Sequence, residues 1–312
     1  MNGVDRSGIP CARFPDINSV KAAIQRGRQL AKAYKVLVIE VDDVVVKYGR
    51  RVYKSEALAM QLVRDATTVP LPRAYAYFSE PATERRDRCG YLVMEKVPGV
   101  PLVDALPRLN DASCDKIALQ LRTYLSSLRS IPSAGRWGMV GKNGIFHGGL
   151  FRYMHHPLTE DQRRHGNPCV ATCTEDVFEY FAKASDDETG ARETEIKHLA
   201  PGVDYSRPAV FSHGDLVPEN IMVDEASGSI TAIMDWERAG WYPYFWDESL
   251  ASMRMSAYQS SRITSQRWER IQDLAIRNEA DGPAVNAFCT VQFMAFMQGM
   301  EQFVDTECYC CY

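Results

Sequence analysis

We predict an α+β fold in two lobes: a small N-terminal antiparallel sheet with a helix, residues 1–97, and a larger, mainly helical lobe, residues 98–312. Three observations predict it. Short β-branched runs crowd the first third of the chain, longer segments with helical spacing follow, and Pro98 and Gly99 separate the two patterns.

The elements of the first lobe follow from local patterns. A helical pattern is followed by two valine-rich runs that predict a hairpin, then by a second helix that must end before Pro70, and by two further strands. In order, these elements are a helix at Asp16–Lys35, strands at Val36–Glu40 and Val44–Tyr48, a helix at Lys54–Ala66, and strands at Ala74–Phe78 and Gly90–Lys96.

The second lobe is mostly helical by spacing, with one β-rich island. We expect helices at Asp115–Arg129 and Thr174–Lys183, and helical spacing through the tail, Ser265–Tyr312. The island is a hairpin of Ile221–Asp224 with Ile230–Asp235, closed by a turn near Ser227 and Gly228.

Composition excludes several classes of protein. The chain has 312 residues, 46% hydrophobic and 24% charged, with a net charge of -4, which argues against a nucleic-acid partner. No secretion signal and no apolar run of about 18 residues is present, so we expect a cytoplasmic protein with no membrane contact. Nine scattered cysteines without paired CxxC spacing predict reduced thiols, and the role of the Cys308, Cys310 and Cys311 cluster stays open. Oligomeric state is unknown.

The segment HGDLVPEN, residues 213–220, and the DWE that ends the β-rich island carry the chemistry. Pairing in the hairpin should place Asn220 opposite Asp235, so that an amide oxygen and a carboxylate meet. Such oxygen donors suit Mg²⁺ that also binds phosphates. Asp215 lies five residues before Asn220, where it can address a substrate hydroxyl as a catalytic base.

A cation for the phosphates is expected from the valine-rich strand of the first lobe. Lys47 lies among Val44, Val45 and Val46, where a buried ammonium needs an anionic partner. Glu56 shares the apolar face of the helix that follows, so we predict a Lys47–Glu56 ion pair.

These motifs together resemble the aminoglycoside phosphotransferase and choline kinase-like family of the protein kinase-like superfamily, from about Val44 to Ala251. The stretch AGWYPYFWDE, residues 239–248, is similar to fungal members of unassigned substrate. The resemblance implies a two-lobed kinase-like fold, ATP and Mg²⁺, and a small-molecule acceptor phosphorylated on a hydroxyl or an amine.

Residue by residue, the resemblance implies a catalytic base at Asp215, Mg²⁺ ligands at Asn220 and Asp235, and phosphate contacts from Lys47 paired with Glu56. It also implies that the backbone carbonyl of Glu95 and the amide of Val97 meet the adenine.

The sequence departs from protein kinases in two places. The segment expected to cover the nucleotide, about Gln25 to Tyr34, looks helical and lacks GxGxxG. HGD replaces HRD, and Val217 stands where many protein kinases have lysine, which favours a small-molecule kinase. Two alternatives remain: a protein kinase, and a catalytically silent nucleotide-binding module.

Overall fold

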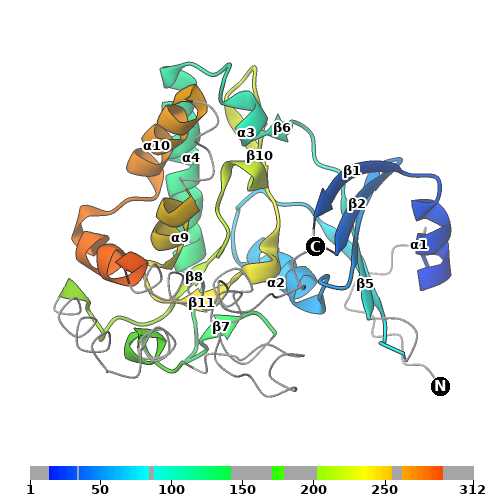
Figure 1. Cartoon of the computed structure of the whole chain (residues 1–312), viewed down its shortest axis with the longest axis horizontal. Helices are drawn as coiled ribbons and strands as arrows, with labels where there is room; N and C mark the ends of the chain where they lie inside the picture. The colour runs from blue at the N-terminus through cyan, green and yellow to red at the C-terminus, as the bar shows by residue number, and fades with distance from the viewer. Residues whose placement is uncertain are drawn as a thin grey trace, which may run out of the picture.

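The computed structural model describes residues 14–33, 35–83, 88–141, 171–178, 202–254 and 262–290. Its described part has the expected two lobes, a small one built on a β-sheet and a larger, mainly helical one (Figure 1). The fold class predicted from the sequence is confirmed.

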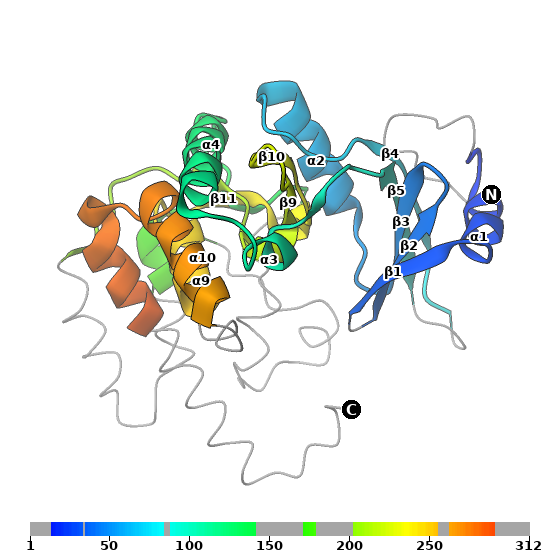
Figure 2. The same cartoon turned by 90° about the horizontal axis from the view of Figure 1, so that it is seen from above.

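The small lobe is a five-stranded antiparallel sheet with the strand order β1-β2-β3-β5-β4. The strands are β1 (Arg28–Ala33), β2 (Val36–Val41), β3 (Val44–Gly49), β4 (Ala74–Glu80) and β5 (Cys89–Glu95). Helix α1 (Ile17–Ile24) covers the outer face of this sheet, where Val20 and Ala23 pack in one apolar cluster with Ile39, Val46 and Val93 (Figure 2).

The prediction of one helix from Asp16 to Lys35 is wrong in its second half. Helix α1 ends at Ile24, and Arg28–Ala33 is strand β1. The sequence RQLAKA favours a helix by local propensity, but pairing with the hydrophobic strand β2 overrides that preference. The segment expected to cover the nucleotide therefore contains the first strand of a hairpin.

Helix α2 (Lys54–Ala66) has the predicted bounds and lies between the sheet and the larger lobe in both cartoon views (Figures 1 and 2). Its buried residues Met60 and Val63 belong to an apolar cluster that also contains Val45 of β3 and Leu121 and Trp236 of the larger lobe. One core therefore connects the two lobes.

The larger lobe places a short hairpin beside a pair of packed helices. Helix α4 starts one turn earlier than predicted, because the Asn110 side chain caps it by accepting a hydrogen bond from the Ser113 amide at 2.9 Å. The elements of this lobe are β6 (Val100–Pro101), α3 (Leu102–Ala105), α4 (Asp111–Arg129), β7 (Gly138–Met139), β8 (Val210–Ser212), η2 (Pro218–Asn220), β9 (Ile221–Asp224), β10 (Ser229–Ile233), η3 (Trp236–Arg238), β11 (Gly240–Tyr242), α9 (Trp246–Arg254), α10 (Arg262–Ala275) and η5 (Glu279–Asp281).

The predicted hairpin is present as β9 and β10, but its register differs from the expected one. Next to the turn the pairing differs by two residues, and a bulge between Ile230 and Ala232 reduces the difference to one at the other end of the hairpin. There the Met234 amide donates to the Asn220 carbonyl at 2.7 Å. Asn220 is thus opposite Met234, and Asp235 lies one residue beyond.

Some predictions fall outside the described residues. These are the continuation of the Thr174 helix past residue 178, the tail after residue 290 and the cluster of Cys308, Cys310 and Cys311. The four described cysteines are free thiols: Cys89, Cys114, Cys173 and Cys289. In the parts of the chain that the structure describes, every helix is too short or too polar to cross a membrane.

Candidate active site

The buried ammonium of Lys47 is the centre of the site. On strand β3, Val44 and Val46 face α1, and successive side chains of a strand point to opposite faces of the sheet. Val45 and Lys47 therefore point to the other face, which α2 covers. Lys47 Nζ lies 2.9 Å from Glu56 Oε2, which is the ion pair expected from the sequence. It also lies 2.7 Å from Asp235 Oδ1 and 3.3 Å from Glu237 Oε2.

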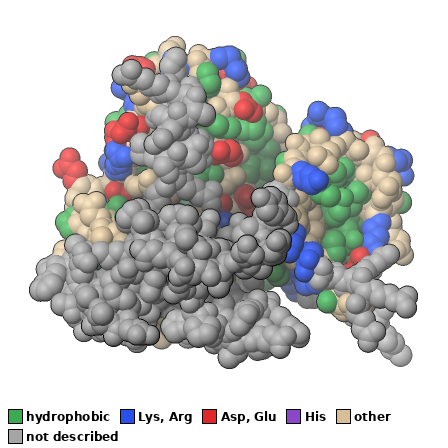
Figure 3. Space-filling model, in the orientation of Figure 1, with side chains coloured by type: hydrophobic (Ala, Val, Ile, Leu, Met, Phe, Trp, Pro, Cys, Tyr) green, Lys and Arg blue, Asp and Glu red, His purple; other side chains and the backbone are tan. Residues whose placement is uncertain are grey.

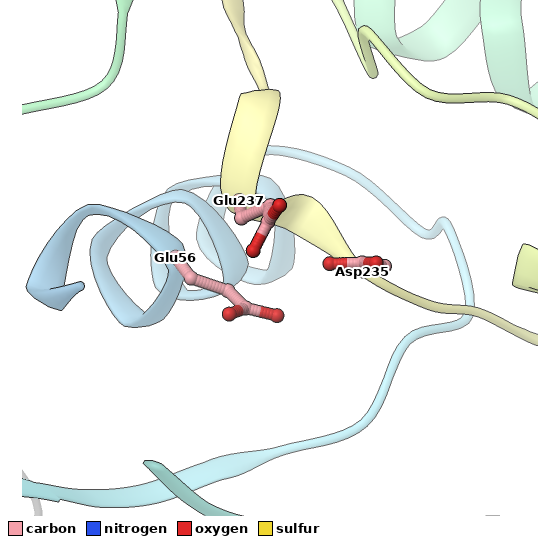
Figure 4. A group of neighbouring side chains, drawn as sticks. All are labelled: Glu56, Asp235 and Glu237. Atoms are coloured by element: carbon pink, nitrogen blue, oxygen red, sulfur yellow. The ribbon is translucent and has the colours of Figure 1, made fainter. Parts of the chain in front are cut away.

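Figure 4 shows how the three carboxylates converge: Glu56 projects from α2, and Asp235 and Glu237 come from the segment that follows β10. Their oxygens lie within 4.8 Å of one another. Three acids around one lysine leave an excess of negative charge. In the space-filling view the surface is hollowed between the two lobes, and acidic side chains lie in the hollow (Figure 3).

The crowding changes how these groups titrate. Burial lowers the pKa of Lys47, but the charges of Asp235, Glu56 and Glu237 outweigh burial and raise that pKa well above its ordinary value. Burial raises the pKa of Glu56 to about 8, although the neighbouring Lys47 opposes the shift. Burial also raises the pKa of Asp235, but Lys47 outweighs it, so the net pKa of Asp235 is lowered.

His213 uses both of its ring nitrogens to hold the loop that carries Asp215, the candidate catalytic base. The Asp215 amide donates to His213 Nδ1 at 3.2 Å, so Nε2 is the donor in the 2.9 Å bond to the Met234 carbonyl. Asn220 Nδ2 donates to the Asp215 carbonyl at 2.9 Å. His213 therefore links the loop of Asp215 to the strand end that precedes Asp235.

Asp235 has φ 62° and ψ 62°, a left-handed conformation that aspartate tolerates better than most residues. This backbone turns the chain from β10 into η3. The turn places Asp235 and Glu237 on the same side, next to Lys47.

Two charged residues of the site were not foreseen from the sequence. Asp247, at the start of α9, is 3% exposed and accepts from the amides of His213 at 3.2 Å and Gly214 at 2.8 Å. Arg238, at the end of η3, has Nη1 3.2 Å from Asp215 Oδ2. An acid in the aromatic run WYPYFWDE was the available signal for Asp247, because a buried carboxylate needs donors.

Gly214 explains why the motif has HGD. Its φ is +77°, and a Cβ there would lie 2.7 Å from the Arg238 carbonyl oxygen. A larger residue would be strained in its backbone and would collide with η3.

The two adenine-contact candidates lie at the junction of the lobes. Glu95 ends β5, where its amide donates to the Arg73 carbonyl at 2.9 Å and its carboxylate accepts from the Arg73 amide at 3.0 Å. Val97 lies two residues further, before β6. The structure thus brings Lys47, Glu56 and Asp235 into one cluster and joins Asn220 to Asp215, with Glu95 and Val97 at the connection between the lobes.

A two-lobed fold whose buried lysine on β3 is paired with a helix glutamate and an aspartate from the other lobe defines a kinase-like phosphotransferase. The chain belongs to the phosphotransferase enzyme family, whose family model matches residues 31–274. The expected class of enzyme, a small-molecule kinase, is confirmed at this level.

Solved structures of aminoglycoside phosphotransferases are similar to this chain in fold. The GDP and kanamycin complex of APH(2")-IIia has a TM-score of 0.52 at 17% identity, with 94% of this chain and 95% of that one covered. The aminoglycoside phosphotransferase APH(4)-Ia has a TM-score of 0.54 at 15% identity, with 92% of each chain covered.

Proposed function

We propose that this protein transfers the γ-phosphoryl group of ATP to a hydroxyl group, or to an amine, of a small metabolite. The observation that carries the proposal is the position of Lys47, whose ammonium joins Glu56 of the small lobe to Asp235 of the larger one. We also propose that residues 1–97 form the nucleotide lobe, and residues 98–312 the catalytic and acceptor lobe.

Lys47 is suited to bind the phosphates of ATP. Its raised pKa keeps it charged at neutral pH, and the two oxygens of the buried Glu56 side chain, 3.0 and 2.9 Å from Nζ, hold the ammonium in place. On the same proposal, the Glu95 carbonyl and the Val97 amide hold the adenine.

Asn220 and Asp235 fit a Mg²⁺ site. The Asn220 amide nitrogen is used by the Asp215 carbonyl, and its Oδ1 has no hydrogen-bond partner among the described residues. The Asp235 side chain is 34% exposed, and its lowered pKa keeps it ionised. Mg²⁺ prefers hard oxygen ligands such as these, and the excess of negative charge around Lys47 favours a bound cation. When bound, Mg²⁺ would neutralise charge on the phosphates.

Asp215 is the proposed base. Its carboxylate takes the proton of the acceptor hydroxyl as the acceptor oxygen forms a bond to the γ-phosphorus. The bond from the γ-phosphorus to the bridging oxygen breaks, and ADP leaves with that electron pair. Bracing by His213, Asn220 and Asp247 keeps the loop of Asp215 fixed while the reactants are aligned.

The experiment is Mg²⁺-dependent ATP consumption with amino alcohols, aminoglycosides, sugars and cell-extract metabolites as acceptors, with mass spectrometry to detect an added phosphate. Asp215→Asn should reduce kcat about 10²- to 10⁴-fold, the usual contribution of a general base, and should leave ATP affinity unchanged. The control is Asp115→Asn, which changes an aspartate on the surface of α4.

Asp235→Asn should in addition weaken ATP binding in the presence of Mg²⁺, measured by calorimetry with and without the ion. Near-normal turnover by Asp215→Asn would remove the base assignment. ATP binding with no phosphorylated product from any acceptor would favour a catalytically silent nucleotide-binding module, and phosphorylation of proteins alone would favour a protein kinase.

A further inference from the structure

The guanidinium of Arg238 lies against the proposed base. Arg238 Nη1 is 3.2 Å from Asp215 Oδ2, and the side chains are only 14% and 9% exposed. An ion pair so well removed from water is screened little by salt, so it constrains both side chains more than a surface pair does.

The position of Arg238 is built into the fold on two sides. Its backbone carbonyl accepts a hydrogen bond from the Tyr242 hydroxyl at 2.7 Å. Its backbone also packs directly on Gly214, where there is no room for a Cβ, so the residue before Asp215 touches the residue that pairs with Asp215.

The two cationic side chains of the site form ion pairs with different acids. Lys47 is held by Glu56, Asp235 and Glu237, whereas Arg238 reaches Asp215. Arg238 follows Asp235 by three residues in the η3 turn, so a single turn carries both a proposed Mg²⁺ ligand and the partner of the proposed base.

We propose that Arg238 is a positioning residue for phosphoryl transfer, an inference that rests on the proposed function. Arg238 holds Oδ2 of Asp215 and thereby turns Oδ1 toward the acceptor hydroxyl. Arg238 gains and loses no proton in this step, and its contact with Asp215 is tighter before the proton transfer than after it.

The test compares Arg238→Ala and Arg238→Lys with wild type and with Arg270→Ala, which removes another Arg–Asp pair, the one with Asp115 between α10 and α4. Loss of a charge-assisted hydrogen bond predicts a fall in kcat of about 10- to 100-fold for Arg238→Ala. We expect an unchanged KM for Mg-ATP, a protein that is still folded at the assay temperature, partial recovery in Arg238→Lys, and recovery of Arg238→Ala by added guanidinium.

Guanidinium rescue separates positioning from a structural role, because a small cation can refill the site but cannot repair a misfolded turn. Wild-type kcat in Arg238→Ala, or a loss that only follows a lowered Tm, would overturn the inference. A raised KM for Mg-ATP with unchanged kcat would do the same, because it would mean that Arg238 acts on the nucleotide side.

A second measurement keeps this inference apart from the proposed function. If wild type transfers no phosphate while binding ATP, the proposed function fails, and carboxyl ¹³C NMR still decides the contact. The Asp215 carboxyl signal, assigned by its loss in Asp215→Asn, should move in Arg238→Ala and stay in place in Arg270→Ala. An unmoved signal would refute the pairing itself.

Discussion

Glu56→Gln should make the protein more stable at mildly alkaline pH while impairing phosphoryl transfer. The Glu56 carboxyl is buried with two other acids around one ammonium, and its pKa is raised from 4.5 to about 8. A carboxyl with a raised pKa in the folded state stabilises the protein fully below pH 4.5. That stability is lost as the pH rises toward 8. Glutamine keeps the shape of the side chain and never ionises.

The magnitude follows from linkage. Between pH 4.5 and about 8 the wild type should steadily lose stability relative to Glu56→Gln, by at most about 1.4 kcal/mol per pH unit, the value for one proton. Lys47 adds nothing to the slope in this window, because its pKa lies well above it in the folded state and at 10.5 ordinarily.

The assay is urea unfolding of both proteins from pH 5 to pH 9, with the difference in unfolding free energy plotted against pH. Glu56→Gln should also lower kcat, because Lys47 Nζ lies 3.0 Å from Oε1 and 2.9 Å from Oε2 of Glu56, and glutamine keeps only one of these oxygens. The stability reasoning would be refuted by a difference that does not change with pH, or by a variant that becomes less stable than wild type as the pH rises.

Three further variants test the geometry around the loop. Gly214→Ala should cost more than about 1 kcal/mol and lower both Tm and activity, because φ is +77° and the new methyl meets the Arg238 carbonyl; an unchanged Tm would contradict that contact. Asp247→Ala should cost about 2 to 5 kcal/mol, since it leaves two buried amides without an acceptor, and denaturant unfolding measures it, with Asp247→Asn expected to lose less. Lys47→Met leaves three acids without their shared cation, so at pH 8 we expect a lower Tm and weak ATP binding. A thermal shift assay with and without Mg-ATP measures both, and an unchanged or raised Tm would mean that the three acids have become protonated.

Local sequence patterns were sufficient to predict some helices and strands but not others. Helix α2 was predicted with its observed bounds, because its apolar face, its start after a strand and the prolines beyond it all agree. Strand β1 was missed because its residues favour a helix and its state depends on a partner strand, a non-local fact. The hairpin was found, but the bulge between Ile230 and Ala232 left no trace in the sequence pattern.

The same division holds for the candidate site. The Lys47–Glu56 pair was predictable, because a cation on a buried strand and an acid on a buried helix face each require a partner. The contacts of Arg238 and Asp247 were not, since both depend on how η3 and α9 pack against the loop of Asp215. Motif spacing gives the residue types, and tertiary packing decides which of them touch.

The apolar cluster that joins Val45 and Met60 to Leu121 and Trp236 has a consequence for how the molecule opens and unfolds. Two lobes that share one core should melt in a single cooperative transition, and a chain cut between residues 97 and 98 should fold in neither half. Because Trp236 directly follows Asp235, loosening this core anywhere along its length should displace the acid of the site. Inactivation by heat should therefore begin at the same temperature as the loss of packing, with no inactive but folded state between them.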